Sequence, residues 1–135
     1  MSEQTMREDA QLVSHRRTAE TFLHDLEQGR VDLAEPWTLG RMAQHCGMGD
    51  TTFSKYCREI MNAGPMEFLN GCRLDRATQK LLEKPAPSIT EVAFAFGFNS
   101  SQYFAACFRQ RFHTSPRDYA LQKSKPSPVI QDRGF

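Results

Sequence analysis

The sequence has no long apolar run, no cysteine pair at metal-ligand spacing and no glycine-rich phosphate loop. Without a run of about 18 apolar residues we expect no membrane-spanning helix and no membrane partner, and no signal peptide is evident. The four cysteines include no CxxC pair, and no histidine stands at a zinc-ligand spacing from them. These absences predict buried free thiols, no metal, no other cofactor and a cytoplasmic location.

The sequence also lacks a recognisable catalytic set. His45 and His113 lie near predicted turns, and neither has an evident nucleophile, acid or base beside it. An enzyme needs such groups to converge on one site. We therefore predict no catalytic residue, and the chain is not expected to be an enzyme.

Charge is distributed unevenly along the 135 residues, although the formal net charge is only +1. Residues 1–37 carry four arginines against eight acidic residues, whereas residues 38–122 carry ten basic residues against seven acidic ones. A mildly basic region suits a domain that contacts phosphates, but a solvated surface can show the same excess. Charge alone does not identify a partner.

One short pattern occurs twice, about 50 residues apart. The first copy reads TLGRMAQHCGM, continues FSKYCR and ends GPMEF, while the second reads SITEVAFAFGF, continues FAACFR and ends SPRDY. Each copy has the pattern of a short helix, a tight glycine turn and a longer helix. A duplicated helix-turn-helix can present two helices to a duplex, which makes double-stranded DNA the leading candidate partner.

Helical periodicity and stop signals predict an all-α chain of about seven helices with no strand. We expect a flexible segment over residues 1–14, and an amphipathic helix beginning at His15 and ending before Gly29. The remaining predicted elements are a helix-turn-helix at 38–62, a linker helix at 65–82, a second helix-turn-helix at 88–112, a final helix at 116–122 and a flexible tail at 123–135. Residues 15–122 thus form the folded domain, in which Trp37 is expected to pack the N-terminal helix onto the core.

The stretch from Trp37 to Gln122 resembles the DNA-binding domain of AraC/XylS-type bacterial transcription regulators. The residues that carry the resemblance are SITEVA, GF, FRQRF and SPRDY in the second copy, with RLDRA and LL in the linker helix. The resemblance implies two helix-turn-helix subdomains that bind successive major-groove segments of promoter DNA. It also implies RNA polymerase as a further partner, together with an N-terminal effector or dimerisation domain. About 36 residues precede Trp37, too few for such a domain, so we expect this chain to be the C-terminal piece of a longer regulator.

Candidate base-reading residues lie opposite the predicted core face of each longer helix. In the first copy Thr51, Ser54 and Lys55 point outward and fall on positions that read bases in the family. Lys55 can donate to guanine, and the two hydroxyls can serve several bases. The candidates on the outward face of the second longer helix are Ser101, Gln102 and Ala106. The family commonly has arginine where this chain has Ala106, so the second helix is expected to read sequence less directly.

Candidate phosphate contacts are the arginines flanking these helices, namely Arg41, Arg58, Arg109 and Arg111. We interpret Arg73 and Arg76, on the linker helix, as solvated or salt-bridged surface residues. One alternative function stays open, a helical protein–protein interaction module with degenerate helix-turn-helix units and little DNA affinity.

Overall fold

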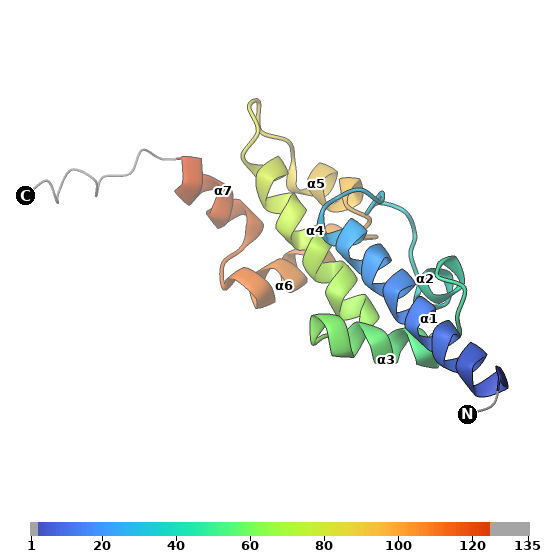
Figure 1. Ribbon diagram of the computed structural model, residues 1–135. Helices are drawn as coiled ribbons and strands as arrows, with labels where there is room; N and C mark the ends of the chain where they lie inside the picture. The colour runs from blue at the N-terminus through green and yellow to red at the C-terminus, as the bar shows by residue number, and fades with distance from the viewer. Residues whose placement is uncertain (1–2, 125–135) are drawn as a thin grey trace, which may run out of the picture. The chain divides into compact units, whose positions relative to one another are not determined.

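The computed structural model describes residues 3–124, with the side chains of residues 3–9 and 11 left out, and contains seven helices and no strand within that range (Figure 1). The helices are α1 (Glu3–Glu27), α2 (Leu39–His45), α3 (Asp50–Met61), α4 (Pro65–Leu81), α5 (Ile89–Ala95), α6 (Ser101–Phe112) and α7 (Pro116–Ser124). The predicted all-α class and helix number are confirmed. Among these helices none is long and apolar enough to cross a bilayer.

The chain divides into two compact units, residues 1–73 and 74–135. In the first unit α1 and α2 pack against α3, and the first part of α4 completes the core. The fully enclosed large side chains there are Leu23, Leu26, Met42, Phe53, Cys57 and Leu69. Each helix supplies these residues at helical spacing, so one apolar face of every helix is removed from water.

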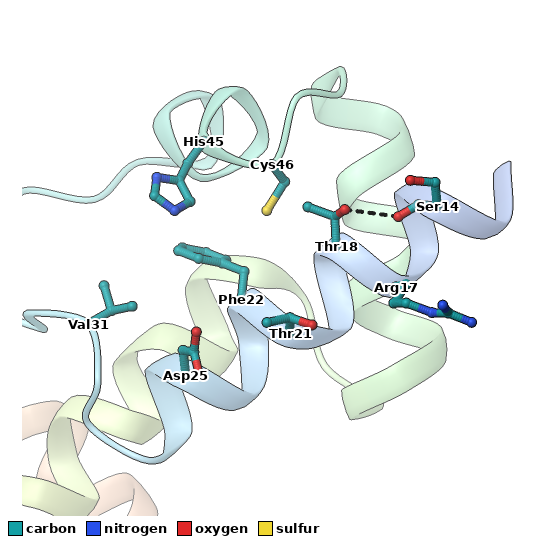
Figure 2. Close-up of a pocket in the computed structure, with 9 residues that line it drawn as sticks. All are labelled: Ser14, Arg17, Thr18, Thr21, Phe22, Asp25, Val31, His45 and Cys46. Atoms are coloured by element: carbon teal, nitrogen blue, oxygen red, sulfur yellow. Dashed lines mark hydrogen bonds between the residues drawn. The ribbon is translucent and has the colours of Figure 1, made fainter. Parts of the chain in front are cut away.

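Trp37 joins α1 to this core, as the sequence predicts. Its ring meets the ring of Phe22 edge-on at a centroid distance of 5.3 Å, and its side chain is only 8% exposed. The Phe22 ring also lies 4.8 Å from the His45 ring at the end of α2. Figure 2 shows this contact beside an open cavity of about 320 Å³, whose lining includes Thr18 and Cys46.

At the N-terminus the structure differs from the prediction of a flexible segment over residues 1–14. Helix α1 begins at Glu3 rather than near His15. Periodicity did not reveal these turns because they need no apolar stripe, and Leu12 and Val13 remain 53% and 58% exposed. The segment contains neither proline nor glycine and is rich in good helix formers, so the helix extends outward from its packed half. The Tyr56 hydroxyl donates to the Leu12 carbonyl oxygen at 3.3 Å, which ties this extension to α3.

The second unit contains the rest of α4 together with α5, α6 and α7. Its core is a chain of aromatic contacts in which Phe104 lies between Phe98 and Phe108, at centroid distances of 5.2 and 5.7 Å. Tyr119 of α7 closes the chain edge-on against Phe108. These residues sit in the second copy of the sequence pattern, so each copy encloses a core of its own. The predicted tail at 123–135 lies outside the described residues except for Lys123 and Ser124, which end α7.

Candidate nucleic-acid interface

A cap and two glycines shape the first helix-turn-helix. Thr38 caps α2 by accepting a hydrogen bond from the Arg41 amide at 3.1 Å. Gly47 then adopts φ +74°, a left-handed conformation that side chains resist. Gly49 is the N-cap of α3. The chain therefore turns sharply between the two helices, and the N-terminal half of α3 projects from the turn.

The residues of α3 divide cleanly between core and solvent. Phe53 and Cys57 are fully buried. On the opposite side Thr51 and Lys55 are exposed and Ser54 is half-buried. The Lys55 ammonium lies 5.9 Å from the centre of the Tyr56 ring and, within residues 3–124, has no acidic partner. Its charge is thus available to a ligand.

The second copy repeats this geometry. Ser88 and Glu91 form a capping box at the start of α5, with hydrogen bonds of 3.0 and 3.1 Å between each side chain and the other residue's amide. Hydrogen bonding to Ser88 lowers the pKa of Glu91 below its ordinary value. Gly97 adopts φ +87°, and Ser100 caps α6.

At its candidate base-reading positions, α6 has fewer hydrogen-bonding side chains than α3. Gln102 and Ala106 are exposed, Ser101 is half-buried, and Phe104 and Phe108 face the core. Gln102 is the amide donor and acceptor of this surface, whereas Ala106 offers only a methyl group. The sequence prediction of an outward position therefore fits Gln102 and Ala106 fully and Ser101 in part.

The four candidate phosphate-binding arginines differ in their existing partners. All four are exposed. The side chains of Arg58 and Arg109 make no hydrogen bond or ion pair within the described part of the chain. Arg111 donates twice to Asp75, at 2.9 Å on each carboxylate oxygen, and Arg41 is paired with Glu35 at 3.2 Å. For an arginine already paired with a carboxylate, that carboxylate competes with a phosphate for the same N–H donors.

The interpretation of Arg73 as a surface residue is wrong. Its side chain is 6% exposed, and burial lowers the pKa of its guanidinium. It donates to the main-chain oxygens of Leu33 and Glu35, both at 2.8 Å. The signal that could have identified this role is spacing, because Leu69, Arg73 and Ala77 follow one another at i, i+4 along a single stripe of α4.

The cysteines lie mainly in the cores, as predicted for free thiols. Cys46, Cys57 and Cys72 are buried and Cys107 is half-buried. Burial raises the pKa of the Cys46 and Cys57 thiols to about 11. Their protonated, apolar state suits packing rather than nucleophilic chemistry.

A family model described as a helix-turn-helix domain matches residues 42–122. Among curated relatives, histidine kinase P4 of Formosa agariphila is 35% identical over 83 residues, a match covering 62% of this chain and 6% of that protein. The HTH-type transcriptional regulator AlkR of Acinetobacter baylyi is 31% identical over 88 residues, covering 65% of this chain and 28% of the relative. The matched region therefore covers less than a third of the length of either relative.

Solved structures match over more of the chain. A transcriptional regulator from Chromobacterium violaceum, described as having an AraC-type DNA-binding domain, superposes with a TM-score of 0.71 at 23% identity, covering 82% of this chain and 96% of the other. The DNA-binding domain of the global transcriptional factor AdpA, solved in complex with a target DNA, superposes with a TM-score of 0.66 at 30% identity, covering 78% and 90%. The first match supports the fold. In the second match, a domain with this fold is bound to a DNA duplex.

Proposed function

The chain belongs to the AraC-type helix-turn-helix family, and on this premise we propose that it binds double-stranded DNA sequence-specifically and regulates transcription. The observation that carries the proposal is the exposed face of α3. Thr51, Ser54 and Lys55 stand there on the side opposite buried Phe53 and Cys57. In a helix-turn-helix this face of the second helix enters the major groove.

Helix α3 is the main reader of bases in this proposal. Lys55 donates to guanine O6 or N7, and the hydroxyls of Thr51 and Ser54 donate to or accept from several base edges. In α6 only Gln102 has strong pairing chemistry, with adenine as its usual partner, while Ala106 can touch a thymine methyl. The α6 surface thus contributes more to shape complementarity with DNA than to hydrogen bonds with bases. Ser101 lies at the edge of this surface.

Phosphate binding is shared among arginines that fall into two classes. Arg58 and Arg109 are immediately available because the described residues give them no partner. Arg41 and Arg111 already donate to Glu35 and Asp75, respectively, so a phosphate competes with these carboxylates for them. Such contacts fix the position of a protein on DNA without carrying sequence information themselves.

Two further partners complete the proposal. The regions matched in two curated relatives cover only 6% and 28% of those proteins, and we propose that this chain acts together with an effector or dimerisation domain. RNA polymerase is the partner through which a promoter-bound regulator would act. The protein would work in the bacterial cytoplasm, on the nucleoid.

The experiment is a binding-site selection from random duplexes, followed by mobility shifts with selected and scrambled DNA. We expect enrichment of one sequence and binding at least about 1,000-fold tighter to selected than to scrambled duplex, the lower end of specific recognition. Failure to enrich any sequence, with weak binding to all duplexes, would contradict the proposal.

That negative outcome would favour the alternative of a protein–protein interaction module. One observation supports this second candidate. Phe94 of α5 is 54% exposed, and a large exposed aromatic residue is a common anchor at protein interfaces.

A further inference from the structure

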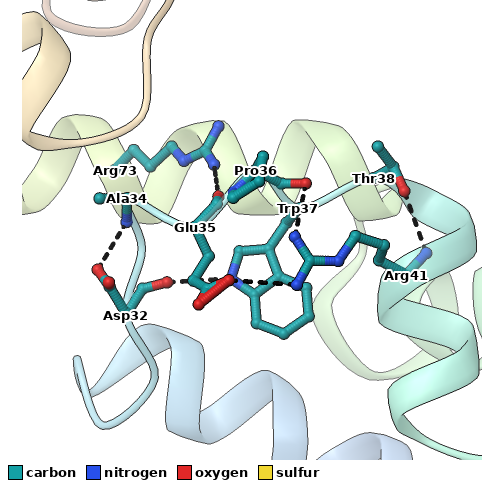
Figure 3. Close-up of polar contacts among 8 residues, drawn as sticks. All are labelled: Asp32, Ala34, Glu35, Pro36, Trp37, Thr38, Arg41 and Arg73. Atoms are coloured by element: carbon teal, nitrogen blue, oxygen red, sulfur yellow. Dashed lines mark hydrogen bonds and ion pairs between the residues drawn. The ribbon is translucent and has the colours of Figure 1, made fainter.

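The segment between α1 and α2 is held by a buried arginine and by the indole of Trp37. Arg73 donates through Nε to the Leu33 oxygen and through Nη2 to the Glu35 oxygen, both at 2.8 Å. The Trp37 indole donates to the Asp32 oxygen at 3.0 Å (Figure 3). Hydrogen bonds from a buried charged donor are strong and cannot be exchanged for water without cost. The main chain at Glu35 is therefore fixed.

Because its main chain is fixed, the Glu35 side chain has a defined neighbour. The Glu35 carboxylate accepts from Arg41 Nη2 at 3.2 Å, and Arg41 Nη1 donates to the Pro36 oxygen at 3.1 Å. The guanidinium carbon of Arg41 lies 5.0 Å from the centre of the Trp37 ring (Figure 3). Three contacts thus hold one exposed guanidinium in one place.

Arg41 occupies a position from which it can meet the DNA backbone. It stands in the first turn of α2, the first helix of the first helix-turn-helix. That helix crosses the phosphate backbone when the second helix enters the groove. The carboxylate of Glu35 takes donors that a phosphate oxygen would use, since both anions accept the same paired N–H groups of arginine.

The pair is weak enough to be exchanged. The side chains of Arg41 and Glu35 are 45% and 43% exposed, so water screens their attraction. Exposed pairs of this kind change an equilibrium constant by at most about fivefold. A phosphate can displace the carboxylate, but the displacement leaves an uncompensated negative charge beside DNA.

We propose that Glu35 attenuates DNA affinity by competing with a backbone phosphate for Arg41, and that Arg73 positions Glu35 for this competition. The inference rests on the proposed function. It concerns the sequence-independent part of binding, because phosphates are the same in every duplex. Glu35 is accordingly a determinant of affinity and salt dependence rather than of base preference.

The test measures binding of Glu35→Gln to selected and scrambled duplexes over a range of salt concentrations. We expect about two- to fivefold tighter binding at low salt, by the same factor for both duplexes. The slope of log affinity against log salt should become more negative by about 0.9, which corresponds to one more phosphate neutralised without an adjacent carboxylate. Glutamine keeps the size of the side chain and removes only its charge.

Two controls isolate the role of Arg41. Asp25→Asn makes the same charge change at another exposed pair, that of Asp25 and Arg30, and should produce a smaller gain. Arg41→Gln should weaken binding, and Glu35→Gln in that background should add nothing. A gain that persists without Arg41, or an equal gain in Asp25→Asn, would reduce the effect to net charge and overturn the inference. Weaker binding by Glu35→Gln would also overturn it.

Different outcomes contradict the proposed function and the role of Glu35. If the unaltered protein selects no DNA sequence, the proposed function fails. If it selects a sequence and Glu35→Gln leaves both affinity and salt slope unchanged, only the competition between Glu35 and phosphate is excluded. Thermal unfolding of each variant verifies that the compared proteins are equally folded.

Discussion

Lys55 is the residue on which sequence recognition should depend most. It is an exposed cation in the N-terminal half of α3, and it shares with Thr51 and Ser54 the side away from the core. A lysine on a groove-facing helix can donate to both acceptors of guanine, a contact worth about 1–3 kcal/mol of discrimination. At the position of α6 that is equivalent to Lys55, no side chain can donate a hydrogen bond to guanine.

We expect Lys55→Ala to relax base preference more than any single substitution in α6. The loss should be about 1–3 kcal/mol for the preferred base and close to zero for others. Binding-site selection with each variant measures it, and Gln102→Ala is the matched comparison. Equal or sharper sequence information under α6 would refute this division of roles.

Arg73 is a single residue on which the stability of the fold should depend. Replacing it with leucine would leave the Leu33 and Glu35 carbonyl oxygens without their buried donor. We expect Arg73→Leu to lower the free energy of unfolding by about 2–4 kcal/mol. Urea denaturation provides the measurement, with Arg30→Leu as a control of the same chemistry at a side chain 71% exposed. If both variants lose the same stability, the buried hydrogen bonds do not have the importance given to them here.

Single residues also show where sequence reasoning reaches its limit. The outward positions of Thr51, Lys55 and Gln102 follow from helical spacing, which is a local property. The partners of Arg73 lie 40 and 38 positions away in sequence, at Leu33 and Glu35. No local pattern specifies such a contact, so the stripe of α4 alone could suggest burial but not what the arginine binds.

Among the elements, α2 and α5 begin with different caps. Thr38 makes one capping hydrogen bond, whereas Ser88 and Glu91 make two reciprocal ones. Because hydrogen bonding lowers the folded-state pKa of Glu91, the ionised carboxylate stabilises the folded state at neutral pH. That contribution disappears as the pH falls through the lowered pKa.

We expect Ser88→Ala to cost about 1 kcal/mol of unfolding free energy at neutral pH. Glu91→Gln should flatten the decline of stability below the ordinary glutamate pKa of 4.5. Denaturant unfolding across the acidic range tests both changes. Thr38→Ala provides the comparison, since its loss should be the same at every pH. A pH profile unaltered by Glu91→Gln would exclude the capping box as its source.

The helices themselves were largely predictable, for physical reasons. Glycines at positive φ, prolines at first turns and hydroxyl caps are local devices, and they mark α2 to α7 closely. The N-terminal part of α1 was missed because an exposed helix carries no apolar stripe. Its formation depends on continuation from the packed turns that contain Phe22 and Leu23.

In the whole molecule, few charged side chains are candidates for binding DNA phosphates. The net charge is +1, and two of the four candidate arginines are already paired with carboxylates. We expect log affinity to fall with log salt at a slope between about −2 and −4, which covers two to four neutralised phosphates. Fluorescence anisotropy from low to moderate salt measures this slope. Arg58→Gln should make the slope less negative by about 0.9. Salt-independent binding would be incompatible with phosphate contacts.

The two copies share a core position but differ in the residues that they expose. Phe53 and Phe104 are both fully enclosed, while Lys55 and Ala106 stand exposed at equivalent positions of their helices. A substitution at an exposed position alters what a helix presents without creating a cavity beneath it. Selection can therefore retune each half of the protein separately, one side chain at a time, while the scaffold stays folded. Under the proposed function, base preference in each half is thus physically independent of the stability of the fold.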